Sequence, residues 1–545
     1  MTHPDSPAVS PADAARPRFA GRFASPALAL SLAIVLAVTA ALAAVRVLGP
    51  SDLHAYDQPK TAAYSVDIAN HGRWVLPRDM LGRPATKPPM VNWIGAAFGS
   101  TFGWNALTLR APSILAGLVV AGLTWLAATK VFNQQELWVE SEGPAHPARF
   151  WFPTLAGVMV VASPLGLKQL ALIRPDMVLC ACLTAGWLAA TALLLPPEDD
   201  PNKPKPWARQ RALQTTLWLC VAGAALAKGP PALLLIAYVV LGGKLLAGRW
   251  SAALRTGVLW GLPLALGLVG LWLYGVHRAN PTHLRETLWG AEIANRVSGS
   301  GQRGNSGGGG GFVNTLVEFP WKMPLYGLTR FLPWSVLAIL ALNKLGSPKK
   351  WFRHPLAPAV LWALVILVFF SLSSKKRADY ALPLGPAVAI LASWWLAIAA
   401  PREVAALTAR RAAVAVFAVA TLLGGLRLMG GSETDSGAGD ALQAFAQAIR
   451  QNADDAPIAF LDGGYHPLQS LLGRNQAGPA SDDLKNTAPW RIVRIETGPN
   501  SPPPRPNPRW TTAAQTPELR DDDLFDGRPG RLVLLRRAAP PPTAP

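Results

Sequence analysis

The sequence predicts an all-α polytopic membrane protein with a small α/β domain outside the membrane at its C-terminal end. Of the 545 residues, 50% are hydrophobic and only 15% are charged, whereas soluble domains carry about 25% charged residues. Many apolar residues form unbroken runs, and about 20 such residues are enough for a helix to span a bilayer. This composition excludes a single soluble enzyme and, over most of the length, intrinsic disorder.

The first apolar run, about 26–48, follows a Pro- and Ala-rich tail at 1–25. Arginines precede the run, so the order resembles a secretory signal peptide. Because the run is long and many others follow it, we expect an uncleaved first helix. Counting every run gives about eleven spans, or as many as about thirteen where prolines divide them. The further spans are expected near 111–131, 151–167, 177–195, 213–227, 230–247, 256–276, 325–345, 355–372, 380–400 and 411–429.

Basic loops predict the orientation of these spans, because cytoplasmic loops carry an excess of Lys and Arg. With a cytoplasmic N-terminal tail, four of the five inside loops are basic. These loops are 132–150 (the acidic exception), 196–212, 248–255, 346–354 and 401–410. The outer connections then include two long ones, 49–110 and 277–324, and the tail from 430 also lies outside.

From about 430 the sequence loses its long apolar runs and predicts a small α/β domain. Asp440 to Arg450 has a helical pattern, and three short apolar segments read as strands. These strands are Ile458 to Leu461, Arg491 to Ile495 and Arg531 to Leu535. The Pro-rich stretches 501–508 and 539–545 are expected to be linker or disordered. This region contains no cysteine and no recognisable catalytic motif.

Several features that often indicate a cofactor or nucleic acid do not do so here. The net charge is +19, but much of the excess lies in the short basic loops, so we expect no nucleic-acid partner. The Gly-rich stretch 299–311 is not followed by the Gly-Lys-Ser/Thr of a phosphate-binding loop. His277 and His283 have the wrong spacing and too few partners for zinc. The three cysteines lie inside apolar runs, so we expect neither a disulfide framework nor a cysteine metal site. We expect no cofactor, and a divalent metal stays an open alternative that no motif supports.

Basic residues on the outer face oppose the orientation bias and therefore call for a reason. The clearest group is the run Ser373-Ser374-Lys375-Lys376-Arg377-Ala378-Asp379-Tyr380 between two spans. Adjacent Lys and Arg side chains form a strong anion site, because their donors gather on phosphate oxygens. The alternative is a solvated turn that caps two helices. Lys87, in the Lys-Pro-Pro segment of the first outer loop, is a second candidate, or else part of a Pro-shaped surface loop.

Acidic residues at the membrane edge complement these cations. Asp57 follows the first span, and Asp176 stands in Arg174-Pro175-Asp176 just before another span. Ionisable groups at such positions are costly and tend to mark function. For each aspartate, the alternative is a helix N-cap. Lys228-Gly229-Pro230 interrupts an apolar stretch, and its alternative is a tight hairpin with a snorkelling lysine.

Taken in order, these segments resemble the polyprenyl-phosphate-sugar-dependent glycosyltransferases of the GT-C fold. Within them, the chain looks most like the bacterial aminoarabinose lipid A transferases and the protein O-mannosyltransferases of glycosyltransferase family thirty-nine. The resemblance covers about residues 50–400. It is carried by Asp57, the Trp-Val-Leu-Pro…Lys-Pro-Pro segment at 74–89, Leu109-Arg110-Ala111-Pro112-Ser113, Arg174-Pro175-Asp176, Lys228-Gly229-Pro230, the loop 280–296 before Phe331-Leu332-Pro333-Trp334, and Ser374-Lys375…Tyr380-Ala381-Leu382-Pro383.

The resemblance implies a domain organisation and a set of site residues. Residues 26–429 would form the transmembrane catalytic domain, with periplasmic catalytic loops at 49–110 and 277–324, and 430–545 a periplasmic soluble domain. Asp57 would be the catalytic base, with Asp176 orienting the acceptor or the lysines. The residues expected around the donor phosphate are Lys87, Arg296, Lys375, Lys376, Arg377 and Tyr380.

One position departs from the family pattern. The family usually places an acidic residue directly after the first-loop aspartate, and here that position is Gln58. If the acidic pair of the family helps to bind a metal or a basic acceptor, that ability is in doubt for this chain. The departure is also compatible with a different acceptor.

The leading hypothesis is an inverting sugar transfer from an undecaprenyl-phosphate-type lipid to an envelope lipid, glycan or protein on the periplasmic face of the inner membrane. The chemistry needs a base for the acceptor and cations for the departing phosphate, and the sequence offers candidates for each. The alternative is a lipid-linked-sugar transporter or flippase, which would often show repeated halves and broken helices at midplane. A non-catalytic assembly protein, a third class, would not need this set of charged residues.

Overall fold

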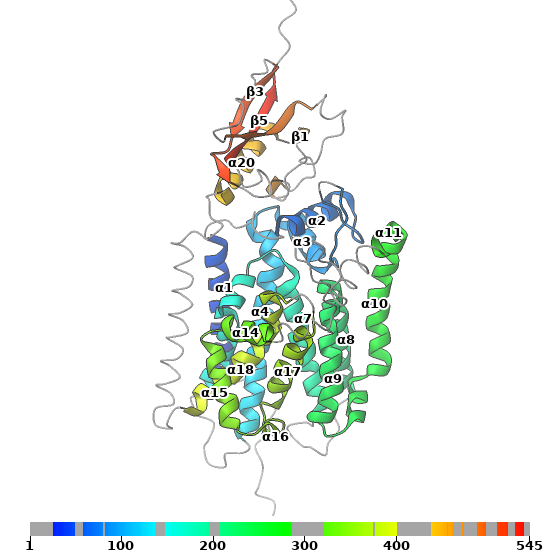
Figure 1. Ribbon diagram of the computed structural model, residues 1–545, viewed down its shortest axis with the longest axis vertical. Coiled ribbons are helices and arrows are strands. Elements are labelled where there is room, and N and C mark those ends of the chain that lie inside the picture. The colour runs from blue at the N-terminus through cyan, green and yellow to red at the C-terminus, as the bar shows by residue number, and fades with distance from the viewer. Residues whose placement is uncertain are drawn as a thin grey trace, which may run out of the picture.

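The protein consists of a helical bundle with a small sheet-containing domain at one end (Figure 1). The computed structural model describes residues 26–48, 58–79, 82–136, 148–195, 207–285, 321–373, 376–399, 438–454, 456–460, 468, 471–472, 488–497, 509–520 and 529–538. The two parts of the predicted fold class, an all-helical membrane part and a small C-terminal α/β part, are both confirmed.

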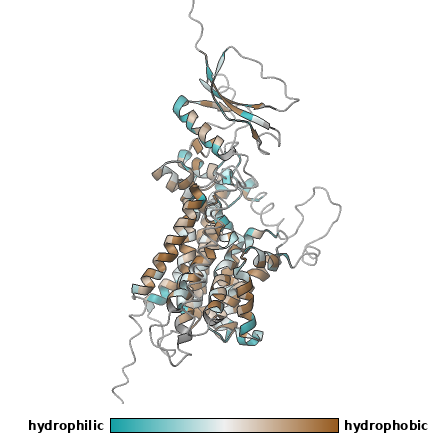
Figure 2. Cartoon of the chain, turned by 90° about the vertical axis from the view of Figure 1, so that its left-hand side faces the viewer, coloured by the Kyte–Doolittle hydropathy of each residue, from teal (hydrophilic) through white to brown (hydrophobic). Residues whose placement is uncertain are grey.

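The long apolar runs of the sequence form the bundle. Ten of the expected spans coincide with helices, and the expected span at 411–429 lies outside the described residues. The helices at these spans are α1 (Pro26–Leu48), α4 (Ala106–Glu136), α5 (Ala148–Ala162), α7 (Pro175–Leu194), α8 (Trp207–Lys228), α9 (Leu233–Leu245), α10 (Val258–Ala279), α14 (Lys322–Thr329), α15 (Trp334–Leu345), α17 (Ala357–Ser371) and α18 (Gly385–Ala399). Apolar residues predominate along these helices (Figure 2).

The bundle belongs to an integral membrane protein. Within the described residues, α1, α4, α7 and α10 are each long and apolar enough to cross a membrane, and α14 with α15 makes a fifth, bent candidate. The helices α5, α9 and α17 are apolar but shorter. Helix α10 has only 11% of its most apolar window buried against the protein, so most of its side chains are free to face lipid.

Two spans that the sequence suggested were continuous are interrupted where a proline follows. The expected span at 325–345 is two helices, α14 and α15, which meet at 110°. Pro333 stands at the break, and proline removes a helical hydrogen bond and disfavours the helical conformation of the residue before it. The span expected at 151–167 ends early and continues as the short helix α6 (Pro164–Gln169), whose N-cap Ser163 accepts a hydrogen bond from the Gly166 amide at 3.0 Å.

Helix α7 lies in the middle of the bundle, in contact with α4, α8 and α9. Its Trp187 is almost fully buried and stacks on Trp362 of α17, with ring centroids 5.8 Å apart. Tyr238 of α9 contacts the Trp362 ring edge-on and shares a 2.7 Å hydrogen bond with Thr191 of α7. These aromatic contacts fix the helix whose first turn carries Asp176.

The connection 49–110, which the sequence predicts to be on the outer face, contains two helices that the sequence did not predict, α2 (Gln58–His71) and α3 (Met90–Phe102). Both helices are too short to be predicted as membrane spans, and α2 is also too polar. Buried Asp67 of α2 accepts hydrogen bonds from two residues of the segment between the helices, from the Arg73 side chain at 3.0 Å and from the Arg78 amide at 2.8 Å. The connection is therefore a folded cap over the bundle, not an open loop.

Short helical segments connect several of the described helices. Three are η2 (Pro230–Ala232), η3 (Trp250–Thr256) and η5 (Ala378–Leu384), and α11 (Pro281–His283) follows α10. A further short helix, α16 (Pro348–Trp351), lies at the end of the bundle opposite the sheet domain (Figure 1).

In the described part of the C-terminal domain, helix α20 (Ala438–Ala453) packs on a five-stranded sheet of order β1-β2-β5-β3, with β4 beside β5. The strands are β1 (Ile458–Phe460), β2 (Trp490–Glu496), β3 (Trp510–Gln515), β4 (Leu519–Arg520) and β5 (Pro529–Arg537). The pair β1–β2 is parallel, and β5 pairs antiparallel with β2, β3 and β4. The predicted helix and three predicted strands are confirmed, while β3 and β4 were not expected. The two Pro-rich stretches lie outside the described residues.

The sheet domain docks on the end of the bundle that holds α2 and α3 (Figure 1). One buried apolar cluster joins Ala62 and Leu109 of the helical part to Leu442 and Phe445 of α20. Arg450 of α20 also donates a hydrogen bond to the Trp104 carbonyl at 3.2 Å. The docking places the C-terminal domain directly above the outer-face connections that the sequence grouped together.

Candidate functional site

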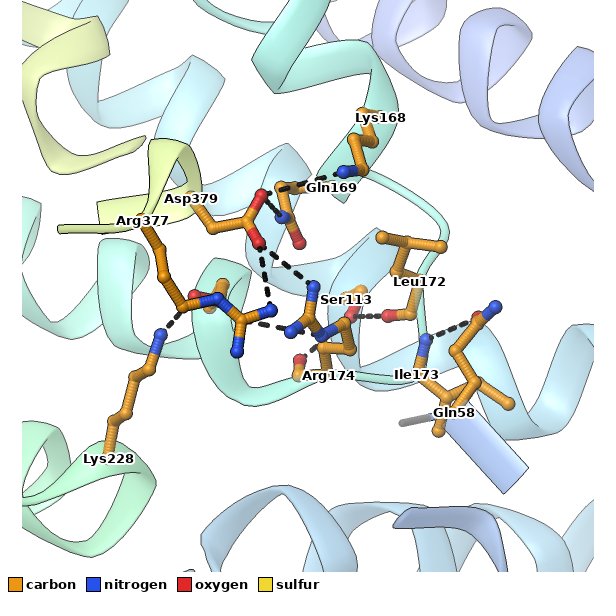
Figure 3. Close-up of polar contacts among 11 residues, drawn as sticks. Gln58, Ser113, Lys168, Gln169, Leu172, Ile173, Arg174, Lys228, Arg377 and Asp379 are labelled. Atoms are coloured by element: carbon orange, nitrogen blue, oxygen red, sulfur yellow. Dashed lines mark hydrogen bonds and ion pairs between the residues drawn. The ribbon is translucent and has the colours of Figure 1, made fainter. Parts of the chain in front are cut away.

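Four connections that the sequence placed on one face meet at the end of the bundle beneath the C-terminal domain. They are the α6–α7 turn, the end of α8, the segment before η5, and the cap formed by α2 and α3. Their polar side chains point toward one another (Figure 3). The segments lie far apart in sequence, so only the fold brings their charges together.

Asp176 lies in the first turn of α7 and is only 3% exposed. Its Oδ1 accepts a hydrogen bond from the Nζ of Lys228, the last residue of α8, and its Oδ2 lies 3.9 Å from the Nε of Arg174. The N-cap position of α7 belongs to Arg174, not to Asp176. The N-cap alternative for Asp176 is therefore wrong, because both oxygens of this carboxylate face cations of the site instead.

Lys228 stands at a tight turn, as one alternative predicted, but its side chain points into the site. Gly229 next to it has a φ of 79°, a left-handed conformation that glycine adopts without strain, so the chain does turn sharply there. The lysine side chain, however, is 13% exposed and does not reach for solvent. Its Nζ lies 4.9 Å from the centroid of the Tyr380 ring, within the range of a cation–π contact.

Asp379 is a charged centre that the sequence did not single out. Its Oδ2 lies 3.1 Å from Arg174 Nη1, and its Oδ1 accepts a hydrogen bond from Gln169 Nε2 at 2.9 Å. Two further cations approach more loosely, Lys168 at 3.7 Å and Arg377 at 3.8 Å. Sequence alone gave little signal for it, because an aspartate inside a basic turn reads as an ordinary turn residue.

The predicted basic turn is not a freely solvated cap. Lys376 Nζ donates to the Ser373 carbonyl at 2.9 Å, and burial, with the charge of Lys322 nearby, lowers the pKa of Lys376. The Arg377 side chain is 55% exposed, and its guanidinium lies 3.8 Å from the Asp379 carboxylate. Tyr380 stacks on Phe370 of α17 with ring centroids 5.2 Å apart, which fixes the ring beneath Lys228.

The Arg174-Pro175-Asp176 turn is held in place from two sides. Gln58, at the start of α2, accepts a hydrogen bond on Oε1 from the Ile173 amide at 3.0 Å. Ser113 of α4 donates to the carbonyl of Leu172, and lies 3.4 Å from the Arg174 carbonyl (Figure 3). Gln58 is fully buried. The side-chain amide of Gln58, at the position where the family usually has an acid, thus serves as a neutral acceptor for a backbone N–H group.

Lys87 belongs to a hairpin that the second outer connection supports. The Ala85 amide donates to the Pro77 carbonyl at 2.8 Å, and His283 Nε2 lies 3.0 Å from the Ala85 carbonyl. Trp272 of α10 donates to the Val75 carbonyl at 3.0 Å. Lys87 itself is half-buried and lies within electrostatic reach of Asp176, so the loop faces the site.

Five of the eight predicted site residues are therefore described and lie around one site: Lys87, Asp176, Lys376, Arg377 and Tyr380. The other three, Asp57, Arg296 and Lys375, lie outside the described residues. Helix α2 begins at the site, because its first residue, Gln58, accepts a hydrogen bond from Ile173. Gln58 follows Asp57 in the sequence. The roles of all eight remain predictions.

The donor set of the site suits an anionic ligand better than a metal ion. Across the described parts of the chain, no group of three His, Cys, Asp or Glu side chains is placed to hold a metal. Around Asp176 and Asp379 stand Lys87, Lys168, Arg174, Lys228 and Arg377. The surplus of cations matches the charge of a phosphate oxygen set.

Known proteins of similar sequence are named arabinosyl transferases, although no family profile matches the chain. The undecaprenyl phosphate-α-4-amino-4-deoxy-L-arabinose arabinosyl transferase of Shewanella sediminis is 27% identical over 346 residues, 63% of this chain and 56% of that protein. An enzyme of the same name from Pseudomonas fluorescens is 26% identical over 63% of this chain and 55% of its own length. The chain spans about half the length of the curated relatives it matches.

The comparison of structures decides the fold. ArnT from Cupriavidus metallidurans bound to undecaprenyl phosphate superposes with a TM-score of 0.64 over 93% of this chain and 97% of that chain, at 18% identity. The chain has the ArnT fold. The apo structure of the same ArnT gives a TM-score of 0.63 over 94% and 99% of the two chains. Because the superposition includes the C-terminal region, the ArnT fold accounts for both parts of this protein.

The expected resemblance to GT-C glycosyltransferases is thus confirmed for the fold and for the similarity of sequence. At 18% and 19% sequence identity to the two ArnT structures, the shared fold does not by itself assign a reaction to this chain. The chemistry has to come from the charged residues described above.

The Asp176–Lys228 pair makes a prediction about stability. Lys228→Met removes the ammonium and leaves the Asp176 carboxylate buried beside a weaker partner, and losing one member of a buried ion pair costs about 3–5 kcal/mol. The double variant Asp176→Asn with Lys228→Met leaves no unpaired charge at this pair. In thermal unfolding of the detergent-purified protein, we expect the double variant to melt above Lys228→Met. A double variant that melts below the single one would contradict the buried pair.

Proposed function

We propose that this protein is an inverting glycosyltransferase that uses a polyprenyl (undecaprenyl) phosphate-linked sugar as donor. The acceptor would be an envelope lipid such as lipid A, a glycan or a protein, on the periplasmic face of the inner membrane. The observation that carries the proposal is the meeting of Asp176, Lys228, Tyr380 and the basic turn at one end of an ArnT fold. The names of the relatives support undecaprenyl phosphate-linked aminoarabinose as the donor to test first.

The cations of the site would hold the donor phosphate. In the transfer, the bond between the anomeric carbon and the phosphate oxygen breaks, and negative charge gathers on the departing polyprenyl phosphate. Cations that are already fixed where this charge develops stabilise the transition state more than the ground state. We assign this role to Lys87, Arg296, Lys375, Lys376 and Arg377, with the Tyr380 hydroxyl as a neutral hydrogen-bond donor. Lys87 lies within electrostatic reach of Asp176, Tyr380 lies beneath Lys228, and Arg377 lies 3.8 Å from Asp379.

Asp57 is our candidate for the catalytic base. A hydroxyl acceptor has to lose its proton as it attacks the anomeric carbon, and a carboxylate can take it up. Gln58 cannot share this role, because an amide does not accept a proton at neutral pH and its oxygen is engaged by the Ile173 amide. Asp176 is assigned to orientation, since both its oxygens face cations.

A transfer assay tests the proposed function directly. Purified full-length protein in detergent or nanodiscs would be incubated with radiolabelled undecaprenyl phosphate-aminoarabinose and lipid A. We expect label to move to lipid A and undecaprenyl phosphate to be released. Other acceptors and donors can be compared in the same format. In sealed vesicles, movement of intact donor between leaflets without any transfer would favour the transporter instead.

The base assignment predicts a specific loss. Asp57→Asn keeps the size of the side chain and removes the proton acceptor, so turnover with a hydroxyl acceptor should fall by about 10²–10⁴-fold. Donor binding and expression should persist. With an acceptor phosphate, which is already ionised, the loss should be smaller. Near-normal transfer to a hydroxyl acceptor by Asp57→Asn would refute the assignment.

The phosphate assignment predicts weaker donor binding in a lysine-free turn. Replacing Lys375 and Lys376 with Ala removes two charged donors, each worth about 1–3 kcal/mol. The affinity for undecaprenyl phosphate should fall accordingly in a direct binding measurement. Lys349 and Lys350 of α16 provide the matched control, because this lysine pair lies at the opposite end of the bundle (Figure 1). Equal affinities in the two double variants would exclude the basic turn.

The proposed topology places the N-terminal tail in the cytoplasm and the C-terminal domain in the periplasm. Its support is the basic end of the bundle, with Lys349 and Lys350 of α16, opposite the C-terminal domain, because basic segments stay in the cytoplasm. Alkaline phosphatase, which is active only in the periplasm, should be active when fused after Gly431. Activity of a cytoplasm-only reporter at the same point would overturn this topology.

A further inference from the structure

Asp379 joins two segments of the site that lie far apart in the sequence, the α6–α7 connection and the basic turn before η5. Its carboxylate is 10% exposed and faces Lys168 of α6, Arg174 before α7, and Arg377 of its own turn. The shortest of these contacts is the 3.1 Å pair with Arg174, whose side chain is 6% exposed. Gln169 adds a 2.9 Å hydrogen bond to the other carboxylate oxygen. Asp379 is therefore held rigidly, and it holds Arg174 in turn (Figure 3).

Arg174 stands between two carboxylates. Its Nη1 is 3.1 Å from Asp379, whereas its Nε is 3.9 Å from Asp176. Asp176 in turn accepts the hydrogen bond from Lys228, which lies over the Tyr380 ring. The result is a chain of alternating charges that runs from the basic turn, through Asp379 and Arg174, to Asp176 and Lys228.

We propose that Asp379 is a positioning residue of the transfer reaction, and this inference rests on the proposed function. By holding Arg174, Asp379 leaves Asp176 to Lys228, so the ammonium stays over Tyr380 and beside the donor phosphate. The same carboxylate ties Arg377 and the backbone of the basic turn to the start of α7. Asp379 itself touches no reacting atom in this role.

The direction of the effect follows from the chemistry of the two cations. A guanidinium presents planar, paired donors to a carboxylate, and an ammonium competes as a single point charge. Once Asp379 is neutral, the Arg174 guanidinium is buried beside Asp176 and turns toward it. Lys228 then loses its hold on Asp176 and moves away from Tyr380. A chemical step that depends on a fixed cation slows when the cation is misplaced.

Four variants separate this role from a general loss of structure. Asp379→Asn removes the charge, and Asp379→Glu keeps it. Arg174→Gln removes the competing guanidinium, and Asp379→Asn with Arg174→Gln removes both partners. Two quantities are measured on the purified full-length protein: steady-state transfer from undecaprenyl phosphate-aminoarabinose, and the rate at which Lys228 reacts with an amine-selective reagent, followed by mass spectrometry.

We expect Asp379→Asn to lower kcat by about 10- to 100-fold, the range of a misplaced catalytic group, with a smaller effect on the donor KM. Lys228 should react several-fold faster in this variant, because its partner is taken. Asp379→Glu should restore much of kcat. Adding Arg174→Gln to Asp379→Asn should return Lys228 to slow labelling, because no guanidinium remains to capture Asp176.

The control is Asp79→Asn in the hairpin of the outer cap, another buried aspartate paired with an arginine, here Arg83 at 2.8 Å. Lys228 labelling in this variant should match the wild type, which shows that loosening the outer face is not enough. Wild-type labelling in Asp379→Asn, or fast labelling in the double variant, would overturn the inference. A wild-type protein that transfers no sugar would refute the proposed function, while the labelling rates still decide whether Asp379 positions Lys228.

Discussion

The structure depends on the pairing of charges that are buried at one end of an apolar bundle. Arg174, Asp176 and Asp379 are each less than about a tenth exposed, and a buried charge is tolerated only when it is paired and hydrogen-bonded. The pairs link α6, α7, α8 and η5, so these helix ends cannot move independently. Gln58 and Ser113 extend the same linkage to α2 and α4 through the backbone of the turn before α7.

This constraint explains why the site faces the C-terminal domain. Hydrophobic packing alone would align the helices, but it would not place the charged side chains of their ends. The ion pairs do so, and they leave more cations than carboxylates at the surface of the cluster. A bundle end with fixed, surplus positive charge at the edge of a bilayer is suited to a lipid-borne phosphate, whose apolar tail can lie along the lipid-facing helices.

The sequence predicted the bundle well because membrane spans depend on local composition, as the ten expected spans that coincide with helices show. It also grouped Asp176, Lys87 and the basic turn on one face, because loop charge predicts sidedness. Asp379 escaped notice because its partners Gln169 and Arg174 are 210 and 205 residues away, and pairing at that distance depends on the fold. Strand β3, Trp510–Gln515, lacks the apolar alternation of a half-buried strand, and α2 is too polar to suggest a span.

The central claim is that the charged cluster binds the phosphate of a polyprenyl donor. It is tested most directly by an experimental structure of the full-length protein in nanodiscs with undecaprenyl phosphate. We expect the phosphate beside Lys376 and Tyr380, within reach of Lys87, with the Asp176–Lys228 and Asp379–Arg174 pairs intact. A phosphate bound elsewhere on the bundle, with this cluster unchanged and apart from it, would contradict the claim.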